Sequence, residues 1–444
     1  MFRQPGGGLG RWPSVSPMPD AIDLRSTTLD NGMRVIVNSD MTSPAVGVNI
    51  WYRVGSADET AGHFGFAHLF EHLMFSGTTS GIASGEHLAT MESVGGTANA
   101  TTSFDRTNYF ESVPAGALEL ALWMESERLA HLAVTPENLA TQREVVKEEK
   151  RQRYDNVPYG DLFDVLLGSQ FGEGHPYGHS TIGSVPDLDA ATLDDVVAFH
   201  EQWYRPDNAC LVLSGCVPVD EALRLADRYL GAVPIPSGPA PVPLAGAGLE
   251  DARPAEVIDL ERDVPRTAVT LSWPSPSVTD PRQLSLEDGL TVLSTGMASR
   301  LVRRLVREVQ LVEGVSASDL GLSRGRSASL LMAHLRPGVS VDRFREEVDG
   351  LLRGLAETGP GAEELARAHV QTERDWLLEM ATVDSRADMI NLYESVLGGA
   401  GKVNDYLDRV RAVTAEQVQA AAASWLDPGR ASVIVHHRAQ EESE

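Results

Sequence analysis

The architecture of the chain is indicated by one stretch near its middle, Thr192-Leu-Asp-Asp-Val-Val-Ala-Phe-His-Glu-Gln-Trp203-Tyr-Arg-Pro206-Asp-Asn-Ala209-Cys-Leu-Val-Leu. It aligns without gaps, at an offset of 222 residues, on Thr414-Ala-Glu-Gln-Val-Gln-Ala-Ala-Ala-Ala-Ser-Trp425-Leu-Asp-Pro428-Gly-Arg-Ala431-Ser-Val-Ile-Val. Each copy predicts a helix capped by threonine, a proline that stops it, and an apolar strand. Such segments often look alike, but the offset is half of the 444 residues, so we favour an internal duplication.

We therefore predict an α+β protein with two homologous halves, each a mostly antiparallel sheet flanked by helices. The Pro-dense segment 233–255 can be neither a helix nor a central strand, and we take it as the linker between the halves. The predicted domains are a flexible tail at 1–20, an N-terminal half at 21–232 and a C-terminal half at 256–444.

Composition excludes several function classes. The net charge of −26 argues against a nucleic-acid or anionic-membrane partner, and no run of 18 apolar residues predicts a membrane span. Residues 1–20 lack the apolar core of a secretory signal, and two cysteines, Cys210 and Cys216, make no disulfide framework. We expect a cytoplasmic protein.

The chemistry-bearing motif is His68-Leu-Phe-Glu71-His72, within an apolar pattern over 63–75 that predicts a helix. His68 and His72 lie one turn apart on one face, with Glu71 beside them. Two imidazoles and a carboxylate can hold zinc and activate its bound water. They can equally form a partly buried polar patch, so a third ligand is needed. The acidic helical run 142–151 offers Glu148 and Glu149.

The spacing from His72 to Glu149 resembles the zinc signature of the pitrilysin/insulinase family of inverted-zincin peptidases, in which 76 residues separate His-x-x-Glu-His from a glutamate. Further segments are similar to that family in the same order, among them 29–35, 54–59, 95–109, 175–178 and 203–209. The chain resembles the short two-half members, such as the beta subunit of mitochondrial processing peptidase.

The resemblance implies that His68, His72 and Glu149 bind Zn²⁺ and that Glu71 is the general base. Glu148 is the competing ligand, but it would point about 100° away from Glu149 on a helix. The resemblance also implies that 95–109 contains an edge strand to which a peptide substrate adds, with Asn99, Ala100 and Thr101 as the expected contacts. An ordinary edge strand protected by polar side chains is the alternative.

Two departures from the family pattern matter. Gln142 stands where similar proteins have a second glutamate near the metal, so we expect a different zinc affinity. Members that cleave alone carry an arginine and, seven residues on, a tyrosine that stabilise the oxyanion, whereas here Arg307 is followed by Gly314. We therefore expect a heterodimer in which a related zinc-less subunit supplies the Arg/Tyr pair.

The resulting hypothesis is a zinc-dependent endopeptidase subunit that hydrolyses peptides or unfolded leader segments in a chamber shared with its partner. Two alternatives stay open: a non-catalytic assembly subunit that kept the fold, and a peptide-binding carrier that uses the edge strand without cutting.

Overall fold

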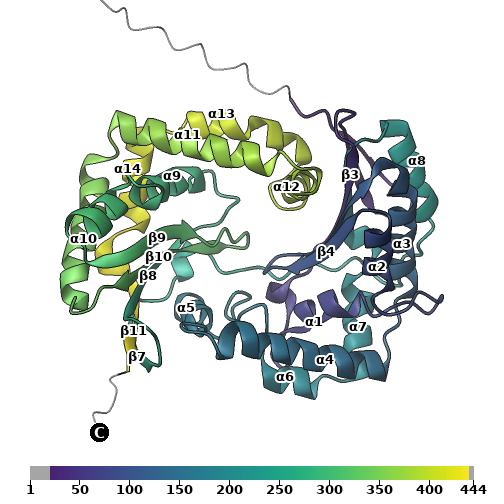
Figure 1. Ribbon diagram of the computed structural model, residues 1–444, viewed down its shortest axis with the longest axis horizontal. Helices are drawn as coiled ribbons and strands as arrows, with labels where there is room; N and C mark the ends of the chain where they lie inside the picture. The colour runs from purple at the N-terminus through teal and green to yellow at the C-terminus, as the bar shows by residue number, and fades with distance from the viewer. Residues whose placement is uncertain (1–20, 440–444) are drawn as a thin grey trace, which may run out of the picture.

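The computed structural model describes residues 21–439 and contains two sheets flanked by helices (Figure 1). The expected tail at 1–20 lies outside the described residues. The α+β prediction with two similar halves is confirmed. No helix within 21–439 is both long and apolar enough to cross a membrane.

The first sheet has six strands in the order β1-β2-β6-β3-β5-β4, and only β2 and β6 run parallel. Its strands are β1 (Arg25–Thr28), β2 (Arg34–Ser39), β3 (Ala45–Tyr52), β4 (Thr97–Thr102), β5 (Thr107–Pro114) and β6 (Ala209–Gly215). β4 is therefore an edge strand, as expected for the 95–109 segment.

The second sheet has five strands in the order β7-β11-β8-β10-β9, with only β7 and β11 parallel. They are β7 (Val257–Arg262), β8 (Ala268–Pro276), β9 (Val312–Asp319), β10 (Arg326–Leu335) and β11 (Ser432–Arg438). This order matches the stretch β2-β6-β3-β5-β4 of the first sheet strand for strand, and the one parallel pair stands at the same end. The topology therefore repeats as the sequence does.

The repeated stretch folds alike in both halves. Helix α7 (Leu193–Trp203) and helix α14 (Ala415–Trp425) each begin after a threonine whose hydroxyl accepts a hydrogen bond from the N–H three residues on. In each copy a short 3₁₀ turn follows, which begins at Pro206 or Pro428. The chain then enters an inner strand of the sheet, β6 in the first half and β11 in the second.

The other helices cover the sheets and the space between them. In the first half they are α1 (Phe66–Leu73), α2 (Glu86–Ser93), α3 (Leu118–His131), α4 (Pro136–Lys150), α5 (Leu162–Gln170), α6 (Val185–Ala190) and α8 (Val219–Tyr229). In the second half they are α9 (Gln283–Ser294), α10 (Val341–Thr358), α11 (Ala362–Glu379), α12 (Val383–Ser395) and α13 (Tyr406–Arg411).

The halves exchange one helix each. α5 packs on β8 and β11 of the second sheet, and its Leu162 and Leu166 share a buried cluster with Ile434. α12 packs on β3 and β6 of the first sheet, where Ile390 joins a cluster with Val212. β8 and β11 occupy the same places in their sheet as β3 and β6, so the exchange is reciprocal. The sequence contains no local signal for this exchange.

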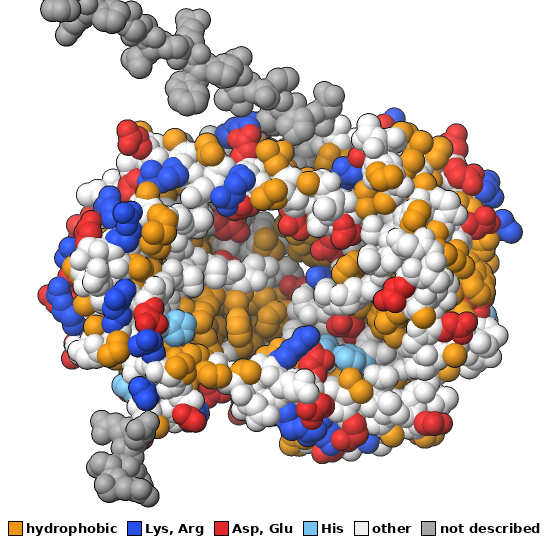
Figure 2. All heavy atoms as spheres, viewed as in Figure 1, with side chains coloured by type: hydrophobic (Ala, Val, Ile, Leu, Met, Phe, Trp, Pro, Cys, Tyr) orange, Lys and Arg blue, Asp and Glu red, His pale blue; other side chains and the backbone are white. Residues whose placement is uncertain are grey.

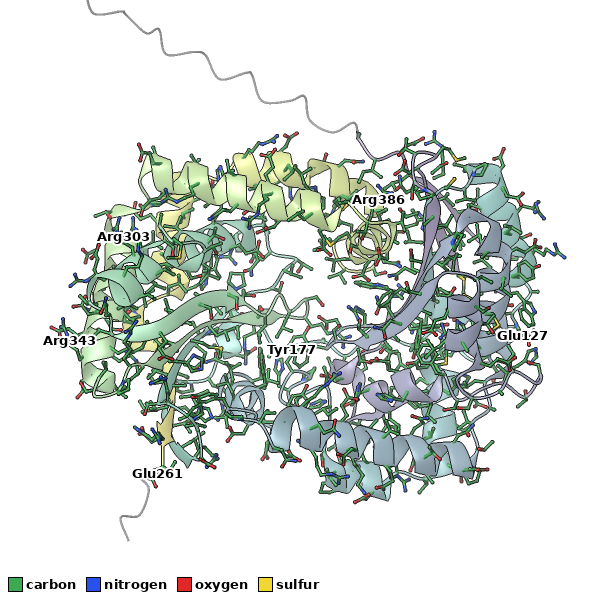
Figure 3. All side chains as sticks on the ribbon, in the orientation of Figure 1. Glu127, Tyr177, Glu261, Arg303, Arg343 and Arg386 are labelled. Atoms are coloured by element: carbon green, nitrogen blue, oxygen red, sulfur yellow. The ribbon has the colours of Figure 1, made fainter. Side chains whose placement is uncertain are left out.

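Polar contacts reinforce both crossings. On α12, one oxygen of Asp388 accepts hydrogen bonds from Trp51 (2.6 Å) and Asn108 (2.7 Å) of the first sheet, and Arg386 pairs with Asp40 at 2.9 Å (Figure 3). Between the halves, Figure 3 also shows Tyr177, whose hydroxyl donates to Asp105 at 2.6 Å.

A buried ionic contact between the halves centres on Arg324, in the loop from β9 to β10. Its guanidinium donates to both oxygens of the buried Asp58, at 2.7 and 2.8 Å, and lies 2.9 Å from Asp105. Both acidic residues belong to the first half, so this loop is fastened to it.

Candidate metal centre

The helix that carries the motif coincides with the helically spaced apolar residues of the 63–75 stretch, which run from Phe66 to Met74. α1 begins at Phe66 because Gly65, its N-cap, has a left-handed backbone with φ of 105°. His68 and His72 lie one turn apart on α1, with ring centroids 4.8 Å apart. His68 is buried and His72 half-buried.

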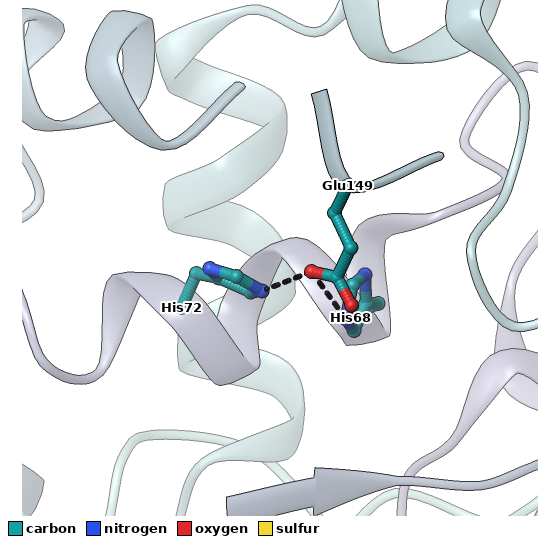
Figure 4. Close-up of side chains that lie close together, drawn as sticks. All are labelled: His68, His72 and Glu149. Carbon is teal, nitrogen blue, oxygen red and sulfur yellow. Dashed lines mark ion pairs between the residues drawn. The ribbon is translucent and has the colours of Figure 1, made fainter. Parts of the chain in front are cut away.

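Glu149 comes from the end of α4, which packs on α1. Its Oε2 lies 3.3 Å from Nε2 of His72 and 3.7 Å from Nε2 of His68 (Figure 4). The structure thus brings together the three residues that the sequence singled out as ligands. Glu148 is exposed and its carboxylate instead accepts hydrogen bonds from Arg151 and Gln152.

The other carboxylate oxygen of Glu149 is engaged elsewhere. α4 runs on into a π-helical turn, η3 (Arg151–Asp155), from which Nη1 of Arg153 lies 2.7 Å from Oε1 of Glu149. Only Oε2 is therefore left to face the two rings. Gln142 is half-buried two turns earlier on α4.

The donor set fits a zinc ion. Zinc is typically held by imidazole nitrogen and carboxylate oxygen in sites with three protein ligands, and here one atom from each residue lies within 4.8 Å of the others. Burial lowers the pKa of His68 to about 3, which keeps this imidazole neutral and its nitrogen free to coordinate a cation.

Glu71 lies on the same helix but is bound to the edge strand. Its Oε2 accepts a hydrogen bond of 2.6 Å from the hydroxyl of Thr102, the last residue of β4. Burial raises the pKa of the Glu71 carboxyl, while the Thr102 hydrogen bond and His72 oppose the rise. A carboxylate with a raised pKa is better suited to take up a proton near neutral pH.

Two acidic residues, the buried Glu59 and the half-buried Asp187, hold the start of α1, and the sequence analysis did not identify them. Glu59 accepts hydrogen bonds from the N–H groups of Gly65 and Ala67, both at 2.8 Å, and lies 3.0 Å from Nε2 of His179. Asp187 accepts from the N–H of Phe64 at 3.0 Å. Carboxylates at a helix N-terminus satisfy its unpaired N–H groups, so these residues position the metal-facing helix.

Close backbone packing adds to this anchoring. A Cβ placed on Gly183 would lie 2.2 Å from the Cα of Gly65, so the two backbones touch where no side chain fits. The sequence signal available for this contact was only the presence of two glycines.

The edge strand presents its residues alternately. Asn99 and Thr101 are exposed, whereas the side chain of Ala100 is buried in the core of the first half. The N–H of Ala100 donates to the side-chain oxygen of Asn99 at 2.9 Å, and the guanidinium of Arg106 donates to the carbonyl of Thr101 at 2.8 Å. Any contact of a peptide with Ala100 must therefore involve its backbone.

The second half lacks the residue pair that the family pattern calls for. Arg307 is exposed on a π-helical segment, η6 (Val302–Glu308), and Gly314 lies on the edge strand β9. At the place equivalent to the three-residue cluster, Asp288 of α9 lies 3.2 Å from Nε2 of His369 on α11. His369 is thus a paired polar residue.

A second acidic cluster lies inside the first half and was missed because its residues are far apart in the sequence. His87, Glu111, Glu125 and Arg128 are all buried, His87 contacts Glu111, and Arg128 pairs with Glu125. Burial lowers the pKa of His87 to about 3 and raises that of Glu111 to about 7. Burial thus favours the uncharged forms of His87 and Glu111, which leaves the Arg128–Glu125 ion pair balanced without an added cation.

Comparison with known proteins gives consistent results. The family profile described as "Insulinase (Peptidase family M16)" matches residues 34–183, and "Peptidase M16 inactive domain" matches residues 190–371. The chain is 29% identical to "Zinc protease PqqE" of Helicobacter pylori, over 86% of this chain and 83% of that protein.

Two further similarities bear on the fold. A crystal structure of a protease from Helicobacter pylori superimposes with a TM-score of 0.87 at 25% identity, covering 94% of this chain and all of that one. "Probable mitochondrial-processing peptidase subunit beta" of Schizosaccharomyces pombe is 27% identical over 46% of this chain and 44% of that protein.

Proposed function

The chain belongs to the pitrilysin/insulinase (M16) family of peptidases, and on this basis we propose that it is the zinc-binding subunit of an endopeptidase acting on peptides or unfolded leader segments. The observation that carries the proposal is the convergence of His68, His72 and Glu149 from two helices, with Oε2 of Glu149 at 3.3 and 3.7 Å from the two imidazoles. These three residues would hold the ion.

Zinc bound there would lower the pKa of a coordinated water and polarise a peptide carbonyl. The chain's own part is proton transfer. Glu71 would take the proton of the attacking water and return it to the leaving amine. Its hydrogen bond to Thr102 holds the carboxylate between the helix and the edge strand, which is where a peptide bond would have to lie.

The edge strand would hold the substrate. β4 has no neighbour on its outer side within the described chain, and an extended peptide could pair with it through the main chain. Asn99 would have to release the N–H of Ala100 for that pairing, while Thr101 would present its backbone and exposed side chain.

A partner subunit would complete the site. Figure 2 shows a hollow between the two halves, with hydrophobic side chains on its floor and acidic side chains toward α12. The second half offers Gly314 on β9 where a tyrosine is needed for oxyanion stabilisation. A homologous zinc-less subunit with an Arg/Tyr pair would supply it.

The first experiment uses the purified chain and three variants. We expect one zinc per chain, removable by EDTA, and slow cleavage of fluorescein-labelled casein. Glu71→Gln should abolish cleavage and retain zinc, His72→Ala should lose zinc, and Glu148→Gln, the matched exposed control, should change neither. Zinc retained by His72→Ala at full affinity would contradict the ligand assignment.

The partner requirement has its own test. A Cβ on Gly314 meets no atom within 4 Å, so the first side-chain atom of Gly314→Tyr would not clash. We expect this variant to cleave faster than the unaltered chain, whereas Ser316→Tyr, on the same strand, should not. Ordinary rates from the unaltered chain alone would show that no partner is needed.

A non-catalytic carrier remains the second candidate, since the profile matching 190–371 is that of an inactive domain. It predicts peptide binding that EDTA and Glu71→Gln leave unchanged, with no cleavage under any condition.

A further inference from the structure

A cavity of the described chain lies in the second half, away from the metal centre. It has a volume of about 590 Å³ and lies among α9, α11, α12 and α13. Apolar and aromatic side chains form most of its wall, including Trp376, Leu392, Tyr393 and Tyr406. Cavities of this size and lining are typical of sites for small organic ligands.

A polar side chain at the cavity has no partner in the protein. Gln283, the first residue of α9, is 2% exposed, and neither its amide nitrogen nor its amide oxygen has a hydrogen-bond partner among the described residues. A buried amide without partners costs free energy, and a ligand with polar groups could satisfy it.

A carboxylate marks the charge that such a ligand should carry. Glu287 lines the cavity one turn after Gln283, and two further acids, Asp288 and Asp319, lie close enough to repel its charge. Together with burial, they raise the pKa of Glu287 to about 7. The local field therefore favours a cation beside Glu287.

The other charged groups of the wall offset this field only in part. Asp280 is paired with Arg282, and Nζ of Lys402 donates to the carbonyl of Leu397 at 2.7 Å. Arg409 is exposed at the cavity and acts on Glu287 from there. Arg409 and Lys402 are thus the two cations that a ligand would meet among the residues lining this cavity, and Arg409 is the one that acts on Glu287.

The aromatic residues provide the second half of a cation site. The ring centroids of Trp376 and Tyr406 are 4.4 Å apart, and those of Trp376 and Tyr393 are 6.0 Å apart with nearly perpendicular planes. Aromatic faces beside a carboxylate recognise alkylammonium groups through cation–π attraction.

Two of the helices around this cavity correspond to the two helices of the metal centre. α9 follows β8 as α1 follows β3, and α11 packs on α9 as α4 packs on α1. In the second half, acidic residues thus lie on α9, the helix that corresponds to α1 with its two histidines in the first half.

We propose that this cavity binds an apolar primary ammonium, with the ammonium on Glu287, the apolar body against Trp376, Tyr393 and Tyr406, and a polar group on Gln283. A free amine or the N-terminal residue of a peptide presents this chemistry. The proposal does not depend on peptidase activity.

The experiment measures binding of phenethylamine to the EDTA-treated chain by isothermal titration calorimetry, with the neutral 2-phenylethanol as comparison. We expect phenethylamine to bind at least ten-fold more tightly than 2-phenylethanol. Glu287→Gln should lower the affinity for phenethylamine by ten-fold or more and leave the affinity for 2-phenylethanol unchanged. Arg409→Gln should raise the affinity for phenethylamine. Glu363→Gln, an exposed carboxylate on α11, is the matched control and should change neither.

Two outcomes would overturn the proposal: equal affinities for the two probes, or a phenethylamine affinity insensitive to Glu287→Gln. If Glu287→Gln does not fold, Tyr406→Leu is the second variant. It should weaken the binding of phenethylamine because part of the aromatic wall is lost, and an unchanged affinity would also refute the site. Phe-Ala-amide and its N-acetylated form then separate the two sources: tighter binding of the free form than of phenethylamine identifies a peptide N-terminus, and weaker binding identifies a free amine.

Discussion

The contact between Gly65 and Gly183 allows a sharp test of how α1 is positioned. Gly183→Ala would place a Cβ 2.2 Å from the Cα of Gly65 and 2.3 Å from the carbonyl oxygen of Phe64. Real Cβ contacts essentially never fall below 3.0 Å, and both neighbours are backbone, so the two segments must separate by about 1 Å. Gly65 is three residues before His68, so α1 must move.

The matched control is Gly62→Ala. Gly62 has a φ of +90°, comparable with +75° at Gly183, but its Cβ would meet no atom within 4 Å. Alanine at either position costs about 1–2 kcal/mol for the left-handed backbone. At Gly183 the overpacking adds about 1–3 kcal/mol, so the two variants should differ in unfolding free energy by that amount.

Zinc affinity is the decisive measurement. Metal sites tolerate errors of about 0.2 Å in ligand distance, and loss of supporting contacts typically costs about 10–100-fold in affinity. Competition with a chromophoric chelator should show Gly183→Ala weakened by at least about ten-fold and Gly62→Ala unchanged. Equal zinc affinities in the two variants would refute the claim that this backbone contact sets the position of the histidines.

Three further predictions concern charged and titratable side chains. Arg153→Gln should change zinc affinity by less than about five-fold, because an exposed pair contributes up to about 1 kcal/mol; a larger loss in the chelator assay would mean that Arg153 orients Glu149 more strongly. Arg324→Met should lower the unfolding free energy measured in urea by about 3–5 kcal/mol, since Asp58 and Asp105 lose their buried partner. The control Arg374→Met, in an exposed pair, should lower it by less than about 0.5 kcal/mol. Similar losses in the two variants would contradict a stabilising role of Arg324 between the halves. Glu111→Gln should raise the melting temperature more at pH 8 than at pH 5. The pKa of Glu111 is raised to about 7 in the folded state from about 4.5 in the unfolded state, so the wild type loses stability as the pH rises through this range, and the glutamine variant does not. A melting-temperature difference that does not change with pH would contradict the raised pKa of Glu111.

The features that sequence reasoning captured are those with a local or periodic signal. The repeat beginning at Thr192 and Thr414 predicted two halves, and capping by these threonines appears in the structure as expected. The His68 and His72 pair follows from helical spacing alone. Glu149 could be selected over Glu148 only through the family resemblance, because no local rule specifies that α4 packs on α1.

The features that sequence reasoning missed depend on packing between distant segments. Glu59 caps α1 and contacts His179, which lies 120 residues away in the sequence. No local sequence pattern near either residue predicts this contact. Apolar spacing located the helix of the motif but could not show the left-handed conformation of Gly65 at its N-cap. The cavity around Glu287 was missed for the same reason, since its wall comes from four helices.

The exchange of α5 and α12 has a consequence for how this chain can be divided. Neither half encloses its own sheet, so a fragment ending before the linker would expose the face of the first sheet that α12 covers, and the complementary fragment would expose the face beneath α5. Two such fragments, produced together, should recognise each other and assemble as a split protein. Such mutual dependence is also what fusion of an ancestral helix-swapped homodimer would leave behind in a single polypeptide.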